Sequence, residues 1–375
     1  MMKHHPITAE IDLTAFKNNI QEIRRIVRPE TKIISVVKAN AYGHGIVEMT
    51  KSALNFGADS LAVARTTEAL QLRKNNVYSP ILVFGYTTKD EIEPLIIYNI
   101  TITVYDLNTA KIISDFAKKI NRQATIHIKI DTGMSRLGFV SKIETIEKIK
   151  KIKELPNIYL EGIYTHFADA DNYDKNYTIM QLKQFNDFLN LLKENNIIIP
   201  IRHAANSAAV IEHPDANFDA VRPGIAQYGL YPSEYVNKNK LNLMPVMTLK
   251  VQVAQVRTIP KGTKVGYGCR FTADHNMKIA TLPIGYADGF TRMLKNGEVL
   301  VKGEIAPVIG TICMDQCMIN VDHIPDVEIG DEVVIIGRQG DNCIRIEDIA
   351  KKLNTINYEV ACMISFRIPR TYANS

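Results

Sequence analysis

The sequence predicts an α/β protein in which an N-terminal (β/α)8 TIM-like barrel is followed by a mainly β C-terminal domain. Between residues 32 and 224, short β-branched runs alternate with amphipathic stretches at helical spacing, which is the pattern of repeated βα units. After residue 232 a polar, turn-rich stretch leads into short apolar runs separated by Gly and Pro. The length of 375 residues exceeds the roughly 250 of one barrel by about 125, which leaves room for a second domain.

Eight strand candidates precede residue 224, and this count favours a closed barrel over an open, doubly wound sheet. They are residues 33–37, 60–64, 80–84, 100–104, 125–130, 158–165, 199–203 and 220–222. Helical patterns lie between them, for example at 109–120 and 177–194. An amphipathic helix within 11–27, led in by a short strand, precedes the barrel.

The second domain is expected to consist of strands within 246–259, 278–284, 299–312, 318–321 and 332–336, with one helix at 346–353. We therefore place the barrel domain at 1–240 and the β domain at 241–375. About the first ten residues are candidates for pairing with the β domain.

Composition narrows the class of protein. With 46% hydrophobic and 23% charged residues, the chain is neither disordered nor collagen-like. The net charge of +5 is spread along the chain, which disfavours nucleic-acid and membrane partners. No apolar run of about 18 residues and no apolar leader is present, so we expect a cytoplasmic protein. Five cysteines without a CxxC pair predict reduced thiols, with no disulfide or metal site.

Chemistry-bearing residues stand just beyond the predicted barrel strands, where the active sites of such barrels lie. Lys38 ends the first strand, Arg136 follows the fifth, His166 ends the sixth, Ser207 follows the seventh and Arg222 ends the eighth. Each residue alone also fits an ordinary role, such as a surface cation, a hydrogen-bonded core histidine or a helix cap. Together they match the needs of pyridoxal 5′-phosphate, which are an amine for the aldehyde, donors for the phosphate and a group at the pyridine nitrogen.

The motifs that contain these residues resemble those of the alanine racemase family over essentially the whole chain. In the barrel they are VVKANAYGHG, KIDTGMSRLG, THFADAD, HAANSA and VRPGIAQYG, and in the second domain VGYG, IGYADG, MDQ and INYE. The resemblance implies a racemase that interconverts L- and D-alanine for peptidoglycan synthesis. It also implies a homodimer with active sites shared between subunits.

The resemblance also implies a role for each matching residue. Lys38 would hold the cofactor and act as one catalytic base, and Tyr267 of the partner subunit would be the other. Arg136 and Met314 would bind the substrate carboxylate, and Lys129, carbamylated in many members, would orient Arg136. The remaining expected cofactor contacts are Tyr42, His166, Asn206, Ser207, Arg222, Gly224, Ile225 and Tyr358, and the expected entry corridor contains Tyr286 and Asp315.

Racemisation requires an acid/base group on each face of the reacting carbon, and Lys38 with Tyr267 provides such a pair. A tyrosine has a pKa of about 10, so to act as a base near pH 7 it needs nearby positive charge or strong hydrogen bonds that stabilise its phenolate, and His166 and Arg222 are the candidate sources. An arginine at the pyridine nitrogen keeps its own proton, which weakens the cofactor as an electron sink and restrains transamination. One departure from many relatives is Phe366, where they carry tyrosine.

Three alternatives remain open at this point. A decarboxylase of the same fold is disfavoured, because such enzymes generally place a glutamate at the pyridine nitrogen and a catalytic cysteine in the second domain. A serine or lysine racemase is harder to separate, since one hydroxyl in a small pocket changes binding modestly. A non-catalytic pyridoxal phosphate carrier would have the lysine-bearing barrel alone and no use for residues 241–375.

Overall fold

The computed structural model describes residues 5–373, which divide into two compact units. Residues 15–41 and 46–245 form the first unit, and residues 5–14, 42–45 and 246–373 form the second. Within the described residues, no helix is both long and apolar enough to cross a membrane.

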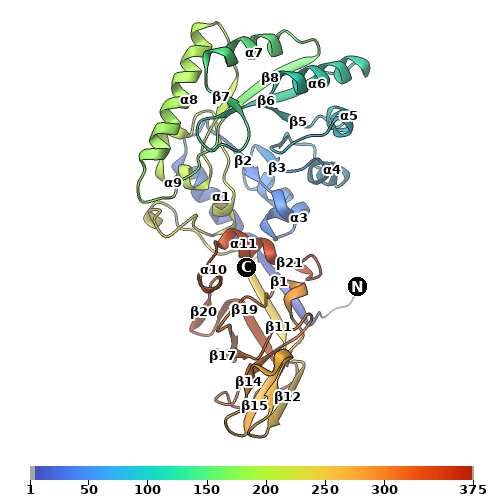
Figure 1. The fold of residues 1–375 in the computed structure, drawn as a ribbon, viewed down its shortest axis with the longest axis vertical. Helices are drawn as coiled ribbons and strands as arrows, with labels where there is room; N and C mark the ends of the chain where they lie inside the picture. The colour runs from blue at the N-terminus through green and yellow to red at the C-terminus, as the bar shows by residue number, and fades with distance from the viewer. Residues whose placement is uncertain (1–4, 374–375) are drawn as a thin grey trace. The chain divides into compact units, whose positions relative to one another are not determined.

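The first unit is a closed barrel of parallel strands (Figure 1). Hydrogen-bonded neighbours follow the order β2, β3, β4, β5, β6, β8, β9 and β10, and the pairings of β5 with β6 and of β10 with β2 close the ring. The predicted fold class is therefore confirmed. The barrel strands are β2 (Lys32–Val36), β3 (Ser60–Val63), β4 (Ile81–Val83), β5 (Thr101–Val104), β6 (Ala124–Asp131), β8 (Ile158–Tyr164), β9 (Ile201–His203) and β10 (Ala220–Val221).

Helices surround the barrel and bury one face each, as the periodicity predicts (Figure 1). In α6 (Leu107–Lys119), for example, Ala110, Ile113 and Ala117 are buried, and Asp106 caps the helix by accepting a hydrogen bond from the Thr109 N–H at 2.7 Å. One additional strand of two residues was not predicted: β7 (Phe139–Val140) pairs with the end of β6. The other helices are α1 (Leu13–Ile26), α3 (Ile46–Asn55), α4 (Thr66–Lys74), α5 (Lys89–Ile97), α7 (Ile143–Lys153), α8 (Asn176–Glu194) and α9 (Ser207–Glu212).

The second unit is built on a mainly antiparallel sheet. Its strand order is β12, β15, β18, β17, β16, β19, β11, β1 and β21, and β1 (Ile7–Asp12) lies between β11 (Met247–Gln252) and β21 (Arg370–Ala373). The predicted runs 246–259 and 299–312 are each two strands. The other strands are β12 (Gln255–Ile259), β13 (Lys264–Val265), β14 (Phe271–Thr272), β15 (Met277–Leu282), β16 (Glu298–Val301), β17 (Glu304–Ile309), β18 (Cys317–Asn320), β19 (Glu332–Gln339) and β20 (Asn342–Ile344).

Two helices, not the single one expected, interrupt these strands. The predicted helix is α10 (Ile346–Leu353), and the sequence interpretation missed α11 (Asn357–Met363). The missed helix has only seven residues and buries Asn357, Val360 and Ala361, so it offers too few turns for a periodic pattern.

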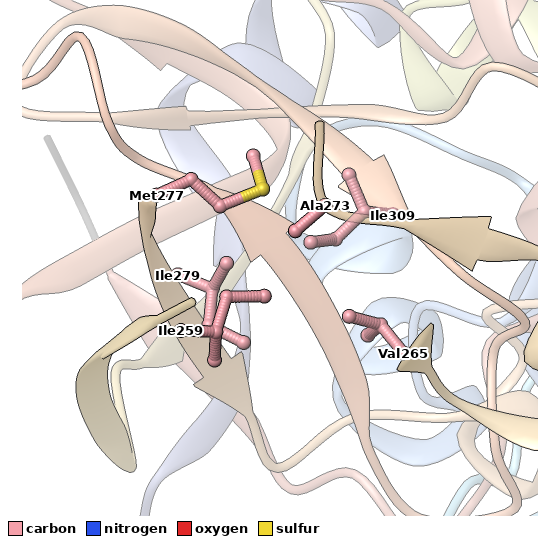
Figure 2. Packing of buried hydrophobic residues seen from close by; sticks show 6 residues of the cluster. All are labelled: Ile259, Val265, Ala273, Met277, Ile279 and Ile309. Atoms are coloured by element: carbon pink, nitrogen blue, oxygen red, sulfur yellow. The ribbon is translucent and has the colours of Figure 1, made fainter. Parts of the chain in front are cut away.

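A compact apolar cluster stabilises the part of the β domain built by β12, β13, β15 and β17 (Figure 2). Ile279 of β15 is fully buried in it, and Ile309 of β17 and Val265 of β13 belong to the same cluster. Because Val265 is buried in this cluster, the loop that starts at Gly266 follows directly after a residue held by the core. The cluster is completed by Ile259, Ala273 and Met277.

Candidate active site

Lys38 lies at the end of strand β2 and begins an unusual turn, α2 (Lys38–Tyr42). The turn is left-handed, with φ angles of 52°, 55°, 53° and 52° at Ala39, Asn40, Ala41 and Tyr42. Non-glycine residues cost about 1–2 kcal/mol each in this region, and consecutive ones are rare. The chain therefore stores backbone strain directly beside the predicted catalytic lysine, which is where functional sites often carry it.

Two side chains in the first unit hold this turn in place. One oxygen of the Glu68 carboxylate accepts a hydrogen bond from the Ala39 N–H at 2.6 Å, and the other accepts from the N–H groups of Ala64 and Arg65 at 2.8 and 3.0 Å. The Asn40 side-chain oxygen accepts from the Ile46 N–H at 2.9 Å. Glu68 thus ties the residue after Lys38 to the neighbouring strand β3 and to helix α4.

Arg222 follows β10, the strand that pairs with β2, and is only 3% exposed. Its guanidinium donates to the carbonyl oxygens of Thr165 and Ala204 at 2.7 and 2.8 Å and to Nδ1 of His203 at 2.8 Å. Nδ1 of His166 lies 3.3 Å away. Burial lowers the pKa of Arg222 to about 10, so the group stays charged at neutral pH.

The cations around Arg222 shift the pKa of their neighbours. Burial lowers the pKa of His166 well below its usual value, and the charges of Arg222, Lys129, Arg136 and Lys38 lower it further. His166 is therefore neutral near pH 7, so Arg222 carries the positive charge of these two residues and His166 has a neutral ring that can hydrogen-bond.

Lys129 of β6 is 6% exposed and donates to the Ile130 carbonyl at 2.9 Å. Burial and the nearby Arg222 lower its pKa to about 7, so much of its amine is unprotonated at neutral pH. Arg136, in contrast, is exposed on the loop after β6. The Asp131 side chain shapes that loop by accepting hydrogen bonds from three consecutive backbone N–H groups, those of residues 133–135, at 2.9–3.1 Å.

Hydrogen-bonding groups from two further strand ends meet at Ser207. The Ser207 hydroxyl, 4% exposed, accepts from the N–H of Gly224 at 2.8 Å and from that of Ala226 at 3.3 Å. Asn206, expected beside the cofactor ring, caps α9 by accepting from the Ala209 N–H at 3.0 Å. The structure thus brings together Ser207, Gly224 and the adjoining Ile225, as the sequence predicts.

The second unit contains the other predicted residues. Tyr42 is buried, and its ring lies 6.2 Å from that of Tyr358 on α11, so these two expected phosphate contacts are neighbours. Arg370 fixes the backbone beside Tyr42, because its guanidinium donates to the Gly43 carbonyl at 2.8 and 2.9 Å.

Tyr267 and Met314 stand on exposed loops of the second unit, with 71% and 53% of their surface accessible. Gly266 has a φ of +71° and the Thr311 hydroxyl donates to the Tyr267 carbonyl at 2.9 Å, so the Tyr267 loop has a defined backbone. The carbonyls of Cys313 and Met314 accept from the N–H groups of Tyr286 and Ala287, both at 3.0 Å, which joins the Met314 loop to the predicted corridor. Asp315 pairs with Arg367 at 2.8 Å.

The sequence interpretation missed several residues that complete the arrangement around Arg222. Tyr164 stacks on His203 with ring centroids 4.7 Å apart, and both Lys129 and Arg222 lie 5.2 Å from its ring centroid. On the other side of His203, Nδ1 of His127 lies 2.9 Å from Nε2 of His203. The available signal was a polar residue in the middle of an apolar strand, as at His127 in ATIHIKID.

Comparisons with known proteins decide the family. Residues 11–232 match the model of the alanine racemase N-terminal domain, and residues 246–372 match that of the C-terminal domain. The chain belongs to the alanine racemase family. As a member of this family it is an isomerase, and the two matched regions account for nearly the whole chain.

Relatives support this family assignment along the full length. An alanine racemase of Methanococcus maripaludis is 58% identical over 371 residues, covering 99% of this chain and all of the relative. The solved alanine racemase of Clostridium difficile 630 superposes with a TM-score of 0.97 at 43% identity, covering 100% and 97% of the two chains. That of Bacillus anthracis, solved with bound L-Ala-P, has a TM-score of 0.93 at 37% identity, with the same coverage.

Proposed function

We propose that the protein interconverts L-alanine and D-alanine with pyridoxal 5′-phosphate as cofactor. One observation carries the proposal. Strands β2 and β10 are hydrogen-bonded neighbours, and in this family member Lys38 follows the first and the buried cation Arg222 follows the second. We assign the cofactor to the domain at residues 1–240 and the second base to that at 241–375.

The residues present fit this cofactor. A phosphate requires hydrogen-bond donors. The Ser207 oxygen accepts from the Gly224 N–H at 2.8 Å, which leaves the Ser207 O–H as a donor for a phosphate, with the backbone of Gly224 and Ile225 beside it. Tyr42 and Tyr358 are the proposed phenol donors. Lys38 offers the amine, and when bound the cofactor supplies an electron sink for the negative charge that develops at the substrate Cα.

Arg222 is the group proposed to face the pyridine nitrogen, with His166 and Asn206 beside the ring. Arg222 stays protonated because its pKa remains at about 10, and a guanidinium only donates hydrogen bonds. Its five N–H donors are largely committed to the carbonyls of Thr165 and Ala204 and to His203. These hydrogen bonds fix the orientation of the Arg222 guanidinium and therefore the position of its positive charge.

Lys38 Nζ and Tyr267 Oη are the proposed acid/base pair, one on each face of the substrate Cα. One removes the Cα proton and the other delivers a proton to the opposite face, which inverts the carbon. We propose that Tyr267 and Met314 act in the active site of a partner subunit, in a homodimer with two shared sites. Their exposure of 71% and 53% leaves both side chains accessible to a partner subunit.

The substrate carboxylate is assigned to Arg136 and the Met314 backbone, with Tyr286 and Asp315 at the entry.

We further propose that Lys129 is carbamylated. With a pKa of about 7, its amine can attack CO2, forming an N–C bond and releasing a proton. The resulting carbamate anion would offset the surrounding positive charge and orient Arg136.

The cellular setting proposed is the cytoplasm, with D-alanine serving peptidoglycan synthesis. No disulfide links the cysteines of residues 5–373, which is consistent with a reducing compartment. Rescue of a bacterium that requires D-alanine, by the wild-type gene and not by a Lys38→Ala version, would test the metabolic role.

Mixing two inactive variants tests the shared site. In a statistical mixture of Lys38→Ala and Tyr267→Ala chains, half of the dimers are mixed and each has one intact site, so about a quarter of wild-type activity should return. No recovery in mixtures that form mixed dimers would contradict sharing.

Proton exchange tests the reaction itself. The wild-type protein in deuterated water should exchange the Cα proton of L-alanine while optical rotation is lost, and L-serine and L-lysine should be slower. A protein that binds the cofactor but exchanges none of the three would favour the non-catalytic carrier.

A further inference from the structure

A row of polar side chains extends from Arg222 through the interior of the barrel. Nδ1 of His203 lies 2.8 Å from the Arg222 guanidinium, and Nε2 of His203 lies 2.9 Å from Nδ1 of His127. Nε2 of His127 in turn lies 3.0 Å from the Glu161 carboxylate. Four side chains from strands β6, β8 and β9 and the end of β10 thus form one continuous hydrogen-bonded chain.

The positions of the protons in this chain follow from Arg222. A guanidinium only donates, so Nδ1 of His203 accepts, and its neutral ring carries its proton on Nε2. That proton is donated to Nδ1 of His127, whose own proton is then on Nε2 and faces Glu161. Burial and Arg222 lower the pKa of His203 well below its usual value, which keeps this ring neutral.

The barrel is shaped around this chain. Arg222 and His127 are 3% and 4% exposed and His203 is fully buried. Opposite His127, strand β8 has Gly162, where an added Cβ would lie only 2.5–2.7 Å from three atoms of the imidazole. The glycine therefore provides the space that the His127 ring occupies.

Glu161 connects the chain to the opposite end of the barrel. Its side chain is 28% exposed and lines a surface hollow together with Lys32, Ile201 and Asp219. These residues stand at or just before the starts of β2, β9 and β10, so the hollow lies at the N-terminal ends of the strands. The hydrogen bond from His127 lowers the pKa of Glu161, which keeps the carboxylate ionised.

We infer that Glu161 and His127 are positioning residues that hold His203 in the tautomer Arg222 requires, and thereby fix Arg222 at the cofactor. The inference rests on the proposed function, in which Arg222 faces the pyridine nitrogen. Because His127 and His203 each have one proton, loss of the acceptor at Glu161 would free His127 to place its proton on Nδ1. Two donors would then face each other between the rings, and His203 would release Arg222.

The test compares Glu161→Gln with the control Glu30→Gln. Glutamine removes the charge, is a weaker acceptor for His127, and can turn its NH2 group toward Nε2, which favours the Nδ1–H tautomer. Glu30 loses the same charge at a 69% exposed side chain, and within the described residues its ion pair is with Arg28. With Glu161→Gln, kcat should fall about three- to tenfold, while KM for alanine changes less than about twofold, because Arg222 is not assigned to the substrate. Glu30→Gln should leave both unchanged.

Nitrogen NMR of 15N-histidine protein provides a measurement that does not depend on activity. In the wild type, His127 and His203 should both be Nε2–H tautomers, and the proton on Nε2 of His127 should shift in Glu161→Gln because it then meets a neutral acceptor. If that variant does not fold, Gly162→Ala serves instead, because its methyl group would displace the His127 ring and disturb both histidine signals.

An Nδ1–H tautomer at either histidine in the wild type, or kinetics and spectra of Glu161→Gln equal to those of Glu30→Gln, would overturn the inference. A wild-type protein with the expected tautomers that exchanges no alanine proton would instead contradict the proposed function.

Discussion

Replacing Glu68 by glutamine tests whether the left-handed turn after Lys38 is held by its neighbours. The Glu68 carboxylate accepts hydrogen bonds from the N–H groups of Ala39, Ala64 and Arg65, one on one oxygen and two on the other. A glutamine has a single acceptor oxygen, so its NH2 group must face at least one of these donors. The variant is almost the same size, so the change is electrostatic.

The expected cost follows from the strain in the turn. Four consecutive left-handed residues carry about 1–2 kcal/mol each, or about 4–8 kcal/mol in total, which the surrounding contacts must offset. The three N–H groups are exposed or only partly buried, so a donor that the glutamine leaves unpaired can turn to water, and the main loss is the charge: hydrogen bonds to a charged acceptor exceed neutral ones by about 1 kcal/mol. Glu68→Gln should therefore lower the free energy of unfolding by about 1–2 kcal/mol.

Activity should fall with stability, because the turn sets the direction of the Lys38 side chain. A displacement of about 1 Å at a reacting group can cost about 100-fold in rate, so we expect kcat to fall by at least about tenfold. Ala39→Gly should move stability the other way, by up to about 1 kcal/mol, since glycine adopts this conformation without steric cost.

Urea denaturation and kcat, measured on both variants and on Glu91→Gln, provide the assay. Glu91 occupies the same position in helix α5, where its carboxylate accepts from the Thr88 N–H at 2.8 Å, but it has no link to Lys38. A capping glutamine works nearly as well as glutamate, so Glu91→Gln should cost less than about 1 kcal/mol. Equal effects of Glu68→Gln and Glu91→Gln on stability and kcat would refute the reasoning.

Three further predictions concern stability. The pKa of Lys129 is lowered to about 7, so between about pH 7 and 10 the unfolded chain binds one more proton at this residue than the folded chain does. The free energy of unfolding should therefore rise by up to about 1.4 kcal/mol per pH unit in this range. Lys129→Met should abolish this contribution to the slope, measured by urea titration in CO2-free buffer. Gly266→Ala should destabilise by about 1–3 kcal/mol, since φ is +71° and the methyl would lie 3.1 Å from the Thr311 nitrogen; a stability equal to wild type in urea would contradict the geometry. Ile279→Ala, which removes most of a fully buried side chain from the cluster in Figure 2, should lower the free energy of unfolding by about 2–5 kcal/mol, whereas Ile279→Val should lower it by about 1 kcal/mol in the same assay.

The barrel could be predicted from the sequence because its strands are short, β-branched and evenly spaced. All eight predicted strands are present, with ends that differ by one or two residues. The residues at the strand ends, such as Arg222 and Ser207, could be found for the same reason, since parallel strands bring their C-terminal ends to one rim.

Features that depend on distant contacts were not predictable. Of the four residues in the left-handed turn only Asn40 has a local preference for that conformation, so the turn depends on contacts such as that of Glu68 with Ala39, 29 residues away. The neutral state of His166 likewise depends on cations from several strands, which no local pattern reveals.

The place of β1 in the sheet has a consequence for how the protein can be divided. This N-terminal strand lies between β11 and the edge strand β21, so a fragment that begins at residue 246 would lack the strand that joins β21 to the rest of the sheet. β11 would then present an open edge and β21 would have lost its partner, which is the situation that promotes aggregation of β proteins. The β domain is thus not a separable module, and the ribosome must finish the barrel before the first strand it made can be paired.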